Sequence, residues 1–106
     1  MQHGEIWWVN FDPSQGSEIQ KCRPAVILTI NSINKARRTV AVVPLSTAAT
    51  PRPPVVIPAP SAGQNSAAVC DQLRAIDKSR VLKRTGLLST SDLAALSSAV
   101  KIVLGL

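Results

Sequence analysis

The sequence predicts a mainly β domain that is completed by one C-terminal α-helix. Short runs of β-branched and apolar residues recur between residues 4 and 84, and clusters of proline, glycine, asparagine and serine separate them, as is typical of antiparallel strands. The end of the chain instead has helical periodicity, with apolar residues at three- and four-residue spacing: Leu93, Leu96, Val100, Val103 and Leu104. A chain of 106 residues suits a single core, so we expect residues 1–106 to form one domain.

The first expected strand, residues 4–11, alternates between two faces. Adjacent Trp7 and Trp8 must therefore point in opposite directions. We expect one tryptophan to fill the core and the other to meet a partner chain or a stacked base, with core or dimer contacts for both as the alternative. Residues 12–16 follow as a turn that begins a mobile loop.

The second expected strand, residues 25–30, is apolar enough to be buried on both faces. Pro24 fixes its own φ and favours an extended Arg23, so the guanidinium should project from the mouth of a rigid strand. Such a charged, planar fork of donors matches the two free oxygens of a phosphodiester. The alternative is that Arg23 closes the strand end and pairs with Glu18 or Asp12.

A solvated basic hairpin tip, with contact to RNA as a second interpretation, is expected over residues 31–38, before a third strand at residues 39–45. Ser46 and Thr47 come directly after that strand. A hydroxyl at this point can be held in a cleft, although strand-end hydroxyls more often only cap turns.

Prolines surround the next apolar segment, residues 55–57, which we therefore expect at a sheet edge. Two further short strands are expected at residues 67–70 and 73–76, with Asp71 and Gln72 between them. These two polar residues are either aimed at a ligand or part of a β-bulge. A turn at residues 77–80 and a short extension at 81–84 lead to the helix, which Ser89 to Asp92 should cap and Gly105 should end.

The composition favours a polyanionic partner, because 12 Lys and Arg against 6 Asp and Glu give a formal charge of +6. Cys22, Cys70 and His3 cannot form a zinc set or a Cys-x-x-Cys pair, so we expect no metal, no cofactor and reduced thiols. No apolar run reaches membrane-helix length and no secretory signal is visible. We therefore expect a soluble cytoplasmic protein.

Ordered motifs along the chain resemble those of the MazF/PemK family of toxin endoribonucleases. They are Gly4 to Trp7, Gly16 to Glu18, Arg23 to Leu28, Pro44 to Thr47, and Asp71 to Arg80. The resemblance covers nearly the whole chain, and the ordered set is more specific than any one motif. It implies a small, strongly bent antiparallel sheet close to an SH3-like barrel, of the MazF/CcdB type, with a C-terminal helix. It also implies a homodimer that cuts single-stranded RNA without a metal, and a cognate antitoxin.

The resemblance also implies residue roles. The active-site arginine of the family falls on Arg23 and its hydroxyl residue on Ser46, while its acidic residues fall on Glu18 and Asp71. Arg23 would stabilise the phosphorane, and Glu18 or Asp71 would be the base for the 2′-OH, leaving a 2′,3′-cyclic phosphate. The expected RNA contacts are Ser17, Lys21, Thr47, Gln72 and Arg74.

Two other functions share this scaffold. A non-catalytic toxin of the CcdB kind, which binds gyrase, is disfavoured because the chain lacks the tryptophan near its C-terminus that those toxins have in common. A catalytically degenerate RNA-binding protein is the other alternative. Its support is that the histidine and arginine of the PemK branch are here Ser17 and Val69. The +6 charge also predicts that the antitoxin is acidic.

Overall fold

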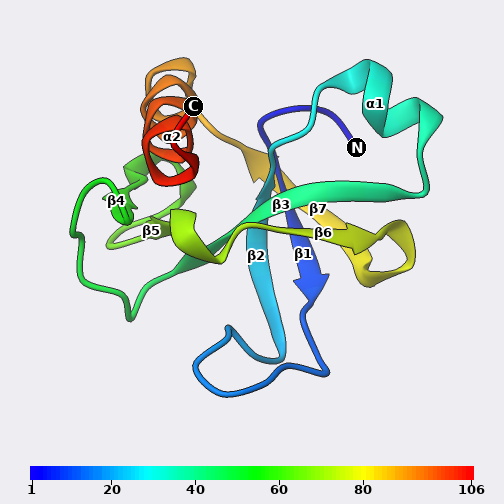
Figure 1. Ribbon diagram of the computed structural model, residues 1–106, viewed down its shortest axis with the longest axis horizontal. Helices are drawn as coiled ribbons and strands as arrows, with labels where there is room; N and C mark the ends of the chain where they lie inside the picture. Colours follow the sequence, from blue (N-terminus) through cyan, green and yellow to red (C-terminus); the bar gives the residue numbers. More distant parts are fainter.

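The computed structural model describes residues 1–106 and consists of one antiparallel sheet with two helices (Figure 1). The strands are β1 (Glu5–Asn10), β2 (Cys22–Ile27), β3 (Thr39–Ser46), β4 (Val56–Pro58), β5 (Ala67–Val69), β6 (Arg74–Asp77) and β7 (Val81–Leu87). The helices are α1 (Asn31–Ala36) and α2 (Thr90–Leu104), and three 3₁₀ turns are η1 (Pro60–Ala62), η2 (Cys70–Gln72) and η3 (Lys78–Arg80).

Strand β3 is the centre of the sheet. The strand order is β4-β5-β3-β2-β1-β7, and β6 pairs with β3 as well. Strands β6 and β5 pair with successive parts of β3, β6 with residues 39–42 and β5 with residues 45 and 46, so the turn η2 forms a corner between them. The prediction of a mainly β fold with a C-terminal helix is confirmed, and the bent sheet stays open rather than closing into a barrel.

Helix α2 covers one side of the sheet, next to β4 and β5 (Figure 1). Its N-cap is Ser89, whose Oγ accepts a hydrogen bond of 3.1 Å from the Asp92 amide, and it ends at Gly105 with φ of +72°. Both signals were predicted. Leu96, Ala99 and Val100 are buried in the core on this side, whereas Leu104, which the helical spacing groups with Leu96 and Val100, is 51% exposed.

A second core lies on the other side of the sheet. Its members are buried apolar residues of β1, β2, β3, β6 and β7, with Phe11 directly after β1: Val9, Phe11, Ala25, Ile27, Val40, Val42, Ile76 and Val81. Trp7 packs against this core, and Trp8 is 40% exposed. The opposite orientation predicted for the two tryptophans is therefore confirmed, although neither is fully buried.

Three segments differ from the prediction. Residues 31–36 form helix α1 instead of a hairpin tip, because the buried Asn34 donates to the Thr29 carbonyl at 2.8 Å and its own carbonyl accepts from Lys78 Nζ. Strand β2 begins at Cys22 and ends at Ile27, so Arg23 lies inside the strand and Ile30 caps α1. Strand β7 extends to Leu87 because it pairs with β1 along its length.

Candidate active site

Arg23 and Ser46 line one hollow of about 140 Å³ at the ends of β2 and β3. The antiparallel pairing of Ala25 with Pro44 places these two strand ends together. Thr47 lines the same hollow, as do Pro24, Leu45, Ala48 and Ser66. The structure therefore brings together the arginine and the hydroxyl that the sequence predicted as partners.

The guanidinium of Arg23 has no hydrogen-bond or ion-pair partner in the chain. The one ion pair joins Arg84 and Glu5, with 2.7 Å between Nε and Oε2. The alternative partners of Arg23 are engaged elsewhere, since Asp12 accepts from the Lys21 amide and Glu18 accepts from the Gln15 amide. The interpretation of Arg23 as a strand-end ion pair is therefore wrong, and its donors are free for an anion.

Backbone amides hold the side-chain oxygen of Ser46, and its hydroxyl proton is free to be donated. Its Oγ accepts hydrogen bonds from the amides of Ala48 at 3.1 Å and Ala49 at 3.2 Å. This is the turn-capping role that was considered as the alternative. Capping uses the acceptor capacity of the hydroxyl and leaves its O–H free to donate, so the two roles are compatible.

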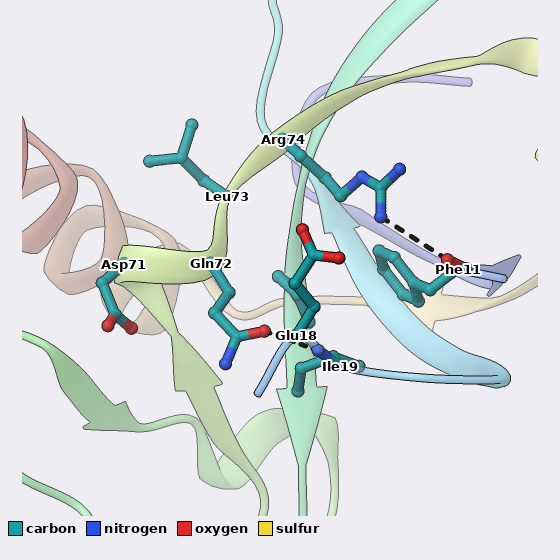
Figure 2. Close-up of a pocket in the computed structure, with 8 residues that line it drawn as sticks. Phe11, Glu18, Ile19, Asp71, Gln72, Leu73 and Arg74 are labelled. Atoms are coloured by element: carbon teal, nitrogen blue, oxygen red, sulfur yellow. Dashed lines mark hydrogen bonds between the residues drawn. The ribbon is translucent and has the colours of Figure 1, made fainter. Parts of the chain in front are cut away.

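Glu18 and Asp71 line a different hollow of about 320 Å³, together with Gln72 and Arg74 (Figure 2). Phe11, Ile19, Pro44 and Leu73 complete its wall. In Figure 2 the Glu18 carboxylate points toward Arg74, whereas Asp71 points away from it. Consecutive residues of β3, Pro44 and Leu45, line the two hollows, so the end of this strand is the wall between them.

Gln72 binds the loop that joins β1 to β2, residues 11–21. Its Oε1 accepts from the Ile19 amide at 2.7 Å, and its Nε2 donates to the Ser17 carbonyl at 3.4 Å. Both ends of the amide are thus used within the chain. The geometry shows an anchor for the loop, a function that the sequence-based assignment of Gln72 to RNA did not include.

Arg74 and Lys21 also have structural contacts. The Arg74 guanidinium lies over the Phe11 ring, 5.8 Å from its centroid, and Nη1 donates to the Phe11 carbonyl at 3.5 Å. Lys21 is exposed in a left-handed conformation with φ of +62°, and its amide donates to Asp12. The Lys21 side chain therefore remains free for a ligand, and that of Arg74 is partly used.

The base of the loop is closed by hydrogen bonds that the sequence did not predict. The Phe11 amide donates to the Lys21 carbonyl at 2.9 Å, and Arg80 donates to the carbonyls of Asn10 and Asp12. Asp12 was expected in a turn or as an ion-pair partner of Arg23, and neither expectation includes this contact with Arg80. Asp12 and Pro13 carry no local sequence pattern that predicts this closure, because Arg80 lies far along the chain.

Neither cysteine is disulfide-bonded. Burial, together with the negative charge of Asp71, raises the pKa of Cys70 to about 11. The Cys70 thiol is thus protonated near neutral pH and unsuited to nucleophilic catalysis. No three His, Cys, Asp or Glu side chains gather into a potential metal-ligand set, and neither helix is long and apolar enough to cross a bilayer.

Residues 2–104 match the family model described as PemK-like, MazF-like toxin of type II toxin-antitoxin system. The chain belongs to this family. The endoribonuclease MazF9 of Mycobacterium tuberculosis is 34% identical, over 100% of this chain and 98% of that protein.

Solved MazF structures also match this MazF-like chain. MazF from Deinococcus radiodurans has a TM-score of 0.86 and 26% identity, over 100% of this chain and 97% of that one. A MazE–MazF structure from the same organism has a TM-score of 0.80 and 24% identity, over 100% and 97%. The family predicted from the ordered motifs is confirmed, and these relatives support a toxin endoribonuclease rather than a gyrase-binding toxin.

Proposed function

We propose that this MazF-like toxin cleaves single-stranded RNA at the hollow lined by Arg23 and Ser46, without a metal. The observation that carries the proposal is the unpaired Arg23 guanidinium beside a hydroxyl whose proton is free. In a chain with +6 charge, such a pair of donors is suited to a phosphodiester.

The proposed reaction is attack of a ribose 2′-OH on the adjacent phosphorus, which yields a 2′,3′-cyclic phosphate and breaks the bond to the 5′-oxygen, which takes a proton from solvent and leaves as a 5′-hydroxyl. The guanidinium of Arg23 has hydrogen-bond donors and no acceptor, so it is a poor base and instead stabilises the charge of the phosphorane. Ser46 donates a second hydrogen bond to the same phosphate. The proton of the 2′-OH passes to a carboxylate, Glu18 or Asp71.

The two candidate bases differ in their surroundings. Glu18 is exposed on the loop of residues 11–21, where its Oε1 accepts from the Gln15 amide at 2.5 Å. Asp71 is exposed on η2 and accepts no hydrogen bond within the chain. We prefer Glu18 because a loop can move over bound RNA, which would bring its carboxylate to the neighbouring hollow.

The proposed protein partner is an acidic antitoxin, since the family is defined by toxin-antitoxin pairs and the toxin carries +6. We also propose a homodimer, because large apolar side chains on adjacent strands β1 and β7 are exposed, with Trp8 at 40%, Leu82 at 51% and Leu87 at 58%. A cytoplasmic location fits an RNA substrate and two free thiols.

Cleavage is tested with purified protein and a long RNA in EDTA, with mapping of the fragment ends and of the terminal phosphate. Losing one preorganised donor typically costs on the order of a hundredfold in rate, so Arg23→Ala should nearly abolish cleavage while the protein stays folded. Ser46→Ala should be milder. Ser46→Thr should be close to neutral, because threonine keeps the donor.

Lys101→Ala is the matched control, because it removes an exposed cation on α2, away from both hollows. It should cleave at the wild-type rate. Folded Arg23→Ala protein that also cleaves at that rate would show that the chemistry lies elsewhere in the chain.

A further inference from the structure

A group of cations lies at the opposite end of β3 from Ser46. Lys35 on α1 and the following Arg37 and Arg38 are exposed, and Lys78 on η3 is half-buried beside them. We call these four residues the α1 cation cluster. Arg37 and Arg38 line a shallow hollow of about 310 Å³ with Ala36 and Thr39.

The backbone holds the cluster together. The Lys78 amide donates to the Arg38 carbonyl at 2.8 Å, next to the pairing of Thr39 with Asp77, and Lys78 Nζ donates to the Asn34 carbonyl of α1. These bonds fix two segments that are distant in the sequence. The fold therefore holds these positive charges close together.

Little negative charge opposes this group. Lys35, Arg37 and Arg38 make no ion pair, and the adjacent acid is Asp77. The Asp77 carboxylate accepts from the Ser79 amide at 2.9 Å. Hydrogen bonds from Ser79, aided by the charges of Arg38 and Arg80, hold the pKa of Asp77 below its ordinary value. Four cations against one engaged carboxylate leave a strongly positive surface that the cleavage site does not use.

We propose that the α1 cation cluster binds phosphates of the RNA substrate several nucleotides away from the cut. This proposal rests on the proposed function. Consecutive guanidinium groups are suited to successive phosphates, and the substrate is itself a polyanion that extends beyond the site. Strand β3 runs from Thr39 beside the cluster to Ser46 in the hollow. At about 3.3 Å per residue these ends are roughly 23 Å apart, about seven stacked nucleotides at 3.4 Å each.

The test measures binding of 2′-O-methyl RNA, which has no free 2′-OH and cannot be cleaved by the proposed reaction. Fluorescein-labelled (U)30 and (U)6 are titrated by anisotropy over a range of salt concentrations. The variant Arg37→Gln/Arg38→Gln is compared with wild type. Arg52→Gln/Lys101→Gln is the matched control, since it removes the same charge from other elements and neither side chain makes a hydrogen bond.

For a single strand, each lost phosphate contact lowers the slope of log affinity against log salt by about 0.7. The cluster variant should therefore lose about 1.4 from the slope for (U)30 and nothing for (U)6. The control should match wild type for both. An unchanged slope for (U)30 would overturn the proposal. If the variant then weakens binding of an acidic antitoxin, the cluster binds that protein and not RNA. An equal loss for (U)6 would overturn the proposal as well, since the cluster would then belong to the cut site.

Cleavage of unmodified RNA by the wild-type protein tests the proposed function separately. If the wild type fails to cleave RNA but the slope for (U)30 still changes, the failure lies with the catalytic assignment and not with the cluster.

Discussion

Replacing Gln72 by alanine should release the loop of residues 11–21 from η2. The wild-type amide joins Gln72 to residues 53 and 55 positions away, through a 2.7 Å bond from the Ile19 amide and a 3.4 Å bond to the Ser17 carbonyl. The second bond is long and contributes little. The first is part-buried, so its loss leaves an N–H group without a partner.

The expected magnitude follows from that N–H group. An unsatisfied, partly buried donor costs about 1–3 kcal/mol. Since each 1.4 kcal/mol is tenfold, the Ile19 amide should exchange with deuterium roughly 5 to 150 times faster in Gln72→Ala. The unfolding midpoint should change much less, because Gln72 lies outside both apolar cores.

Two further variants make the measurement specific. Gln72→Glu keeps an acceptor for the Ile19 amide and loses only the donor to Ser17, so it should retain protection at Ile19. Gln20→Ala removes an exposed glutamine of the same loop that makes no side-chain hydrogen bond, and it should exchange like wild type. Unchanged exchange at Ile19 in Gln72→Ala, together with weaker RNA binding, would refute the anchor and restore the role first predicted, a direct RNA contact.

Three other outcomes are expected. In native protein at pH 8, iodoacetamide should modify half-buried Cys22 and spare Cys70, whose pKa burial raises to about 11, and intact mass before and after unfolding checks this. Ser89→Ala removes the α2 N-cap and should cost about 1 kcal/mol, or about 4–8 °C in Tm by calorimetry. Burial raises the pKa of Glu5, but hydrogen bonds from Trp7, Gln2 and Arg84 outweigh it and hold the pKa below 4.5. Its stabilisation is thus present above pH 4.5 and lost as pH falls, so acid titration of Glu5→Gln should show a shallower loss of stability.

Elements specified by local chemistry could be predicted from the sequence. Helix α2 has a serine cap, an apolar stripe and a terminal glycine within its own residues, and its bounds follow from them. The edge position of β4 follows in the same way from its flanking prolines. Helix α1 has no such signal, because its N-cap Ile30 makes no side-chain bond and Asn34 is held by Thr29 and Lys78.

Strand β7 illustrates the same limit. Residues 82–85 are all exposed, so no apolar alternation marks the strand, and pairing with β1 determines its length. The residues of the candidate site differ in the same way in how far the sequence predicts them. Arg23 and Ser46 were paired through the family resemblance of the motifs around them, whereas the partners of Gln72 could not be predicted, because the loop it binds is brought to it only by the fold.

The separation of the two hollows places a requirement on the proposed reaction. A 2′-OH and the phosphorus it attacks belong to the same nucleotide linkage, so the base and the phosphate donors must meet at one point. Glu18 and Arg23 line different hollows on either side of the end of β3. Catalysis by Glu18 therefore requires the loop of residues 11–21 to shift toward Arg23. The strength of the Gln72 anchor then controls both the order of the loop and its freedom to make that movement, so Gln72 can affect the rate through the loop alone.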